Sequence, residues 1–100
     1  MDQKTRDVLI AARAIIADPA MWYQGDWSAS GELRNLDEPC CAEAAIRRIA
    51  PRDTAHHTIE RMAQFTPDYT QLRIFNDATA TTHADIMAVF DRAIAGEQAE

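Results

Sequence analysis

Apolar residues near the start of the chain recur every three or four positions, which is the period of an amphipathic helix. The repeat runs from Val8 to Ile16, and Asp18-Pro19 interrupts it. Proline inside a helix removes a backbone hydrogen bond and clashes with the preceding turn. The pattern therefore predicts a first helix over about residues 5–17.

A second apolar repeat of the same period occupies the middle of the chain and runs from Cys40 to Ile49. Asp37 can cap the first turn of this helix, and Pro39 would lie at a position where helices tolerate proline. Pro51 ends the repeat. We predict a second helix that begins near Asp37.

A third helix can begin at Asp53 or Thr54, with apolar positions that continue to Phe65 before Thr66-Pro67 breaks the pattern. Beyond this break, residues 69–77 fit two structures equally well. They could form a short helical turn or an extended connection that places apolar side chains in the core. The pattern leaves both structures open.

The last predicted helix has the clearest start and stop signals. Thr82 and Asp85 stand three residues apart, which is the spacing of a capping box with Asp in the place of Glu or Gln. An apolar stripe follows from Ile86 to Ile94. Gly96 can end the helix, because glycine readily adopts the left-handed conformation found after helix ends.

The segment between the first two predicted helices has no helical period. It alternates aromatic and polar residues around glycine, as in the run from Trp22 to Trp27, and this favours a short hairpin or an ordered loop. The fold class is therefore mainly α. We expect one domain over residues 1–100, with about four helices, a Trp- and Gly-containing hairpin or irregular insert between the first two, and frayed ends at 1–4 and 97–100.

Composition narrows the possible partners. A chain of 100 residues has the usual size of one domain. Its net charge is −6, and no basic cluster exceeds the pair Arg47-Arg48, so a nucleic-acid partner is not expected. The chain lacks both a membrane-length apolar run and a signal-peptide pattern at its start, which predicts a cytoplasmic protein without a membrane partner.

The two cysteines, Cys40 and Cys41, are adjacent, and neighbouring side chains on a helix point about 100° apart. They cannot readily pair with each other, which is typical of a reducing compartment. Together with His56 and His57 they suggest a zinc site, but adjacent pairs on two helices cannot all converge on one metal. We therefore expect no metal and no cofactor.

A cysteine nucleophile is a sharper alternative. Cys40 or Cys41 would lie in the first turn of the second helix, where the helix dipole lowers a thiol pKa. His56, His57 or His83 could act as the base, and Asn76 could orient it. The plain interpretation is that small residues here pack against a neighbouring helix, and that His83 is a solvated residue at a helix start.

Two groups of residues could bind a partner or ligand. Trp22, Gln24 and Trp27 lie on the insert, where aromatic side chains could either cover the core or anchor a partner. Asn76 and Asp77 lie before the last helix, where short polar side chains can contact ligands. The plain alternative for this Asn-Asp pair is a turn stabilised by bonds to nearby backbone N–H groups.

Four short motifs also occur in a recognisable order along the chain: W-x-Q-G at 22–25, C-A-x-x-A at 41–45, F-N-D at 75–77 and T-x-x-D at 82–85. This order resembles a family of small uncharacterised proteins encoded in bacterial and phage genomes, and the resemblance covers residues 22–94. The chain departs from the family pattern at Glu43-Ala44, where a bulky residue and glycine are typical, and at Phe75, where Trp is frequent. The resemblance implies a compact domain and mobility between phage and host genomes, and it assigns no activity.

These observations favour a small cytoplasmic accessory protein that binds a protein partner and is derived from a phage or prophage. Aromatic anchors on the insert would supply most of the binding energy. The alternative is a small enzyme with a Cys, His and Asn arrangement. Self-association through alanine-rich helices, giving a homodimer, is a further expectation.

Overall fold

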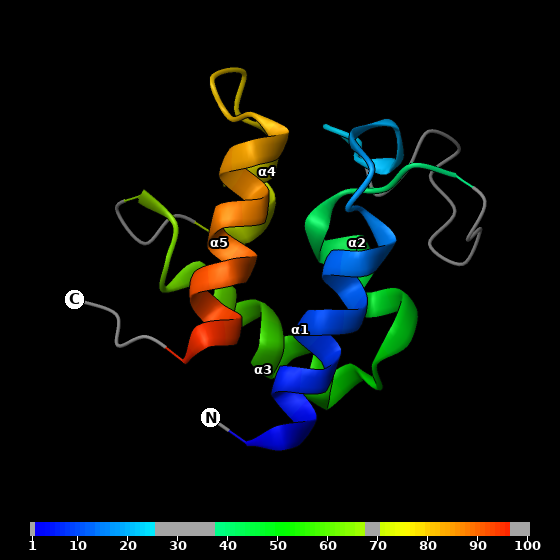
Figure 1. The fold of residues 1–100 in the computed structure, drawn as a ribbon, viewed down its shortest axis with the longest axis vertical. Coiled ribbons are helices and arrows are strands. Elements are labelled where there is room, and N and C mark those ends of the chain that lie inside the picture. The colour runs from blue at the N-terminus through cyan, green and yellow to red at the C-terminus, as the bar shows by residue number, and fades with distance from the viewer. Residues whose placement is uncertain (1, 26–37, 68–70, 97–100) are drawn as a thin grey trace.

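The computed structural model describes residues 2–25, 38–67 and 71–96, and these residues are mainly helical (Figure 1). The elements in chain order are α1 (Gln3–Ile15), the 3-10 turn η1 (Pro19–Met21), α2 (Ala42–Ile49), α3 (Arg52–Ala63), α4 (Leu72–Asp77) and α5 (His83–Ala95). Within the described ranges, the β pairing is limited to an isolated parallel bridge between Trp22 and Cys40. The predicted class, a mainly α single small domain, is confirmed.

The first and last helices lie side by side and run in opposite directions (Figure 1). Each begins at a residue whose side chain accepts a backbone hydrogen bond: Asp2 from the Thr5 N–H at 2.8 Å, and Thr82 from Asp85. The predicted capping box of α5 is present in full, and Gly96 ends the helix with φ +76°. Because both ends of α5 are set by local chemistry, its boundaries were predictable.

The core is built largely from small side chains. On α2, four residues are buried, and three of them are alanines (Ala42, Ala44, Ala45 and Ile46). Larger buried side chains from the rest of the chain complete the core: Leu9, Ile16, Met62, Leu72, Ile86 and Phe90. Alanine allows neighbouring helices to approach closely, so the buried alanines of α2 serve helix packing.

The predicted start of the second helix was wrong. The helix begins at Ala42 and is capped by Cys41, whose Sγ accepts the Ala44 N–H at 3.3 Å. Cys40 instead forms the bridge with the Trp22 segment, because its N–H donates to the Met21 carbonyl at 2.9 Å. This long-range pairing takes the backbone groups that a longer helix would have used.

The predicted hairpin is not confirmed. Residues 26–37, which include Trp27 and the predicted cap Asp37, lie outside the described residues. In the described part of the insert, η1 leads into the bridge at Trp22 and then to Gly25. The ambiguity over residues 69–77 is settled for Leu72–Asp77, which form α4. At the N-terminus, α1 starts at Gln3, inside the stretch expected to be frayed.

Candidate functional site

A buried asparagine connects the segments that carry the sequence motifs. The side chain of Asn76, at the end of α4, is fully buried. Its Oδ1 accepts the indole N–H of Trp22 at 2.7 Å and the backbone N–H of Ala42 at 3.1 Å. Its Nδ2 donates to the Tyr23 carbonyl at 3.0 Å and to Asp77 Oδ1 at 2.9 Å. The carboxamide therefore uses both acceptor positions and both donor hydrogens.

The partners also determine which way the carboxamide of Asn76 points. An indole N–H and a backbone N–H can only donate, so the oxygen must face Trp22 and Ala42. A carbonyl and a carboxylate can only accept, so the nitrogen must face Tyr23 and Asp77. No other residue type of this size supplies two acceptors and two donors in this arrangement.

Gln24 holds the chain that follows α4. Its Nε2 lies 3.1 Å from the Asn76 carbonyl, 2.9 Å from the Ala78 carbonyl and 3.2 Å from the Thr81 carbonyl. The last carbonyls of a helix have no partner within the helix. A side chain from a distant segment thus caps α4 and fixes the course of residues 78–82 toward α5.

Gly25 completes this network. Its N–H donates to Asp77 Oδ1 at 2.9 Å, so a single carboxylate oxygen accepts from both Gly25 and Asn76. The backbone of Gly25 has φ +124°, and a Cβ there would lie 3.3 Å from the Tyr23 ring. Both observations favour glycine, because residues with a side chain rarely adopt this backbone conformation. We call Trp22, Gln24, Gly25, Asn76 and Asp77 the Asn76 network.

His83 is part of the neighbouring packing and is not a solvated helix-start residue, contrary to the prediction. It is half-buried, and its Nε2 lies 2.7 Å from the Ile16 carbonyl at the end of α1. Its ring contacts that of Trp22, with centroids 5.9 Å apart. His83 thus links the start of α5 to the end of α1.

The two cysteines have the environment of packing residues. Cys40 and Cys41 are free thiols and fully buried. Burial raises the pKa of Cys41 to about 11, an increase only partly opposed by its bond from the Ala44 N–H, and burial also raises the pKa of Cys40. His57 is exposed and lines a separate cavity on α3. An activated nucleophile needs a lowered pKa, so this environment argues against the catalytic alternative.

Metal ligands are likewise dispersed in the described structure. Across residues 2–25, 38–67 and 71–96, no three His, Cys, Asp or Glu side chains are grouped closely enough to hold a metal ion. The cysteine pair and the His56-His57 pair therefore do not form one centre.

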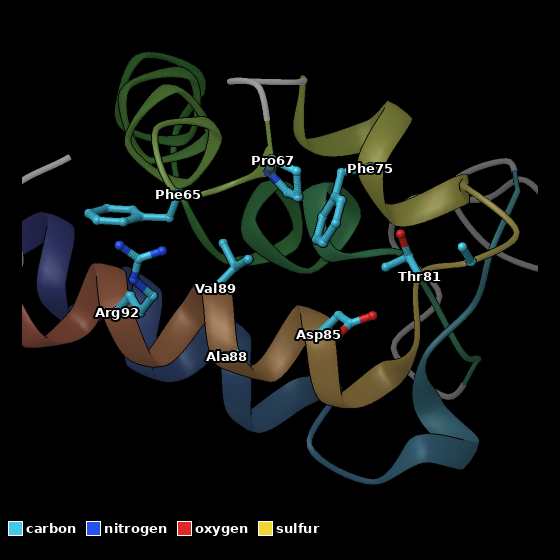
Figure 2. Close-up of a pocket in the computed structure, with 9 residues that line it drawn as sticks. Phe65, Pro67, Phe75, Thr81, Asp85, Ala88, Val89 and Arg92 are labelled. Carbon is cyan, nitrogen blue, oxygen red and sulfur yellow. The ribbon is translucent and has the colours of Figure 1, made fainter. Parts of the chain in front are cut away.

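An apolar cleft of about 500 Å³ lies beside the Asn76 network, between α4, α5 and the end of α3 (Figure 2). Its lining consists of Phe65, Pro67, Phe75, Ala80, Thr81, Asp85, Ala88, Val89 and Arg92. Figure 2 shows Phe75 pointing toward α5, the Phe65 ring lying over Arg92, and Val89 on α5 between them. Phe75 is half-buried, whereas Phe65 and Val89 are 5% exposed.

Charged side chains stand at the two ends of this cleft. Along α5, Arg92 lies at the end near Phe65, and Asp85 lies at the end near Thr81 (Figure 2). The Arg92 guanidinium stacks on the Phe65 ring at 5.1 Å, and that of Arg61 does so at 4.7 Å. The Asp85 Oδ2 accepts the Thr82 N–H at 2.9 Å in the capping box.

The structure brings together most of the predicted partner-binding residues, but as an internal network. Hydrogen bonds connect the segment that carries Trp22 and Gln24 to the segment that carries Asn76 and Asp77. Trp27 lies outside the described residues. The cleft residues were missed, because Phe65 and Val89 have the spacing of ordinary core positions. The F-N-D motif was the one available signal: Phe75 faces the cleft and Asn76 faces the network.

The fold and the site define a small, mainly helical domain that contains a polar network and an adjacent apolar cleft. The chain belongs to DUF6197, a family of unknown function, whose model matches residues 1–96. This agrees with the resemblance to an uncharacterised family. A search of curated proteins found no match, and neither did a search of solved structures. In the described part of the chain, no helix is long and apolar enough to cross a membrane.

Proposed function

We propose that this protein is a small cytoplasmic accessory protein that acts by binding a protein partner. The observation that supports this most is the apolar cleft between α4 and α5, with Phe75 half-exposed in its wall. Concave apolar sites with a few polar groups at their edges are where proteins bind other molecules. The two free, buried thiols are typical of a protein in a reducing compartment.

The chemistry of the cleft favours binding over catalysis. Its lining contains a carboxylate, Asp85, and a guanidinium, Arg92, and both already contact other groups of the protein. Neither cysteine lines it. Aromatic and aliphatic side chains in such a cleft can contribute binding energy without any reacting group.

The Asn76 network serves this function indirectly. Gln24 fixes the carbonyls of Ala78 and Thr81, and the residues of this loop form one wall of the cleft. Asn76 anchors the end of the helix that carries Phe75. In this proposal the motif residues position the binding surface, and the cleft contacts the partner.

We further infer that the protein originates from a phage or prophage. The resemblance to a family encoded in bacterial and phage genomes supports this origin. Inspection of the genes that flank the coding sequence tests it: phage structural, integrase or lysis genes as neighbours are expected, and housekeeping neighbours in several host strains contradict it.

The binding function can be tested with two matched substitutions on α5. Ala88 and Ala84 are both exposed and lie one turn apart, but only Ala88 lines the cleft. We expect Ala88→Trp to fill the cleft with its own indole, and Ala84→Trp to leave it open. Affinity capture from host lysate with the wild-type protein, followed by reconstitution of the complex from purified components, identifies the partner.

The proposal predicts that the reconstituted complex forms with the wild-type protein and with Ala84→Trp. For Ala88→Trp, binding should weaken at least about tenfold, as expected when a central contact of an interface is blocked. Circular dichroism and thermal unfolding confirm that both variants fold. If no captured protein forms a complex with the purified chain, and light scattering shows no homodimer, the binding function is wrong.

A further inference from the structure

The charges at the ends of the cleft have a spacing that selects among partners. Asp85 and Arg92 are seven residues apart on α5, which is about two helical turns or roughly 10 Å along the axis. Ala88 and Val89 form the apolar floor between them. The cleft therefore has a negative end, an apolar centre and a positive end, all along one face of one helix.

The cleft offers side chains for binding, and most of its lining is helical. Five of the nine lining residues lie on α4 and α5, where backbone groups bond within the helix, and the others come from the end of α3 and the loop that Gln24 contacts at the Ala78 and Thr81 carbonyls. Strand addition requires an open sheet edge, and within the described residues no strand lines the cleft. We therefore expect a partner to enter the cleft through its side chains.

The volume of the cleft sets the size of what enters. A space of about 500 Å³ accommodates a few large side chains, but not a whole helix with a diameter of 10–12 Å. A partner helix can insert apolar residues spaced three or four apart while its backbone stays outside. Two turns of such a helix span the distance from Asp85 to Arg92.

We propose that the cleft receives one face of an amphipathic helix from the partner protein, a proposal that rests on the binding function above. Apolar side chains of that helix enter between Phe65, Phe75 and Val89. A basic residue of the helix lies near Asp85, and an acidic residue two turns away lies near Arg92. The charge complementarity sets the register of the helix, since rim charges fix orientation more than they add affinity.

Both charged residues are suited to these contacts. A carboxylate accepts hydrogen bonds through two oxygens, so Asp85 can cap α5 with Oδ2 and still attract a basic group. Arg92 stacks on Phe65 and has a further contact within the chain, and the five N–H donors of its guanidinium allow it to bind a carboxylate in addition to these. Stacking also holds the Arg92 side chain in place before the partner arrives.

Three synthetic peptides test the proposal. Each is a side-chain-stapled, alanine-rich helix with Phe and Leu anchors, and the three differ only at two flanking positions seven residues apart. One peptide carries Lys and Glu at these positions, one carries two Lys and one carries two Glu. Fluorescence anisotropy measures their affinity for the wild-type protein, for Arg92→Glu and for Arg52→Glu, a matched charge reversal at an exposed residue on α3 outside the cleft.

The wild-type protein should bind the Lys/Glu peptide about fivefold more tightly than either other peptide, as expected for one exposed ion pair gained. Arg92→Glu should reverse the preference in favour of the Lys/Lys peptide. Arg52→Glu should keep the wild-type order, and Ala88→Trp should lose all three peptides. Equal affinity for the three peptides, or no binding at about 1 mM, overturns the helix proposal.

Failure of this proposal can be told apart from failure of the binding function. If a reconstituted partner complex is unaffected by Ala88→Trp and by excess Lys/Glu peptide, the protein binds its partner elsewhere and the proposal for the cleft is wrong. If the peptides bind as expected and no partner complex can be reconstituted, the cleft has the proposed specificity and the wider function is wrong.

Discussion

At the scale of single residues, the polar side chain of Asn76 is fully buried. A buried polar group is stabilising only when its hydrogen bonds are made, and those of Asn76 join three segments of the chain. Replacing either end of the carboxamide leaves buried groups without partners. Asn76 is thus a positioning residue for the helix that carries Phe75.

We predict that Asn76→Asp lowers the free energy of unfolding by about 3 kcal/mol or more. The carboxylate keeps the shape of the side chain, but it turns two donors into acceptors that face the Tyr23 carbonyl and Asp77 Oδ1. Urea titration measures the loss. The difference from wild type should narrow at acid pH, because the protonated carboxyl regains one donor.

Asp77→Asn is the control for this prediction. Its amide oxygen can still accept from Gly25 and Asn76, so we expect a change of about 1 kcal/mol or less. A loss for Asn76→Asp as small as that of the control would show that the network contributes little to the stability of the fold.

The sequence shows why this role was only partly predictable. Asn and Asp commonly bond to nearby backbone, and that local alternative was the plain interpretation of Asn76-Asp77. The observed partners Trp22 and Ala42 are 54 and 34 residues away in the chain. Spacing rules describe neighbours in sequence, so they contain no information about such contacts.

At the scale of elements, helix boundaries that are set by local signals were predicted correctly, and a boundary that is set by a long-range contact was not. The boundaries of α5 follow from Thr82 and Asp85 at its start and from Gly96 at its end, and each of these residues acts only on the nearest turn of the helix. The start of α2 was predicted too early because Asp37 and Pro39 are also residue types that are typical of helix starts. There, the bridge between Cys40 and Trp22 prevails over helix propensity.

Gln24 shows how a side chain in one segment can hold the backbone of another, here the loop between α4 and α5. Gln24→Glu replaces the donor that contacts the Asn76, Ala78 and Thr81 carbonyls with an oxygen that repels them. We expect faster hydrogen exchange at the Thr81 amide, by about fivefold, since losing one hydrogen bond is worth about 1 kcal/mol. NMR exchange measurements test this directly.

The same substitution should weaken binding at the cleft, although Gln24 does not line it. The Lys/Glu peptide should bind Gln24→Glu less tightly than wild type, because the wall formed by Ala80 and Thr81 is no longer fixed. Gln3→Glu, an equivalent change on the exposed surface of α1, serves as the control. Unchanged exchange at Thr81 would mean that Gln24 does not hold this loop.

At the scale of the whole molecule, the small buried side chains that allow close packing also determine how the fold responds to pH. Cys41 occupies the crowded start of α2, and burial of its thiol raises the pKa from 9.0 to about 11. The burial of Cys40 acts in the same direction. The folded state therefore favours protonated thiols, whereas the unfolded chain releases their protons more easily.

The consequence is a loss of stability in alkaline solution. Below pH 9 both states keep the Cys41 proton, so the stabilisation is fully present. Between pH 9 and about 11 only the unfolded state releases it, so the free energy of unfolding falls as the pH rises. Two pKa units correspond to a loss on the order of 3 kcal/mol.

Cys41→Ser isolates this effect, because serine caps helices well and does not ionise in this range. All other ionisable groups are common to the two proteins, so the difference between them reports the Cys41 thiol. Thermal or urea unfolding at a series of pH values should show the wild type losing stability relative to Cys41→Ser as the pH rises above 9. Parallel curves from pH 8 to 11 would mean that the thiol is as easily ionised in the fold as in the unfolded chain. That result would remove burial as an argument against the catalytic alternative, but an activated cysteine would in addition need a pKa below its ordinary value.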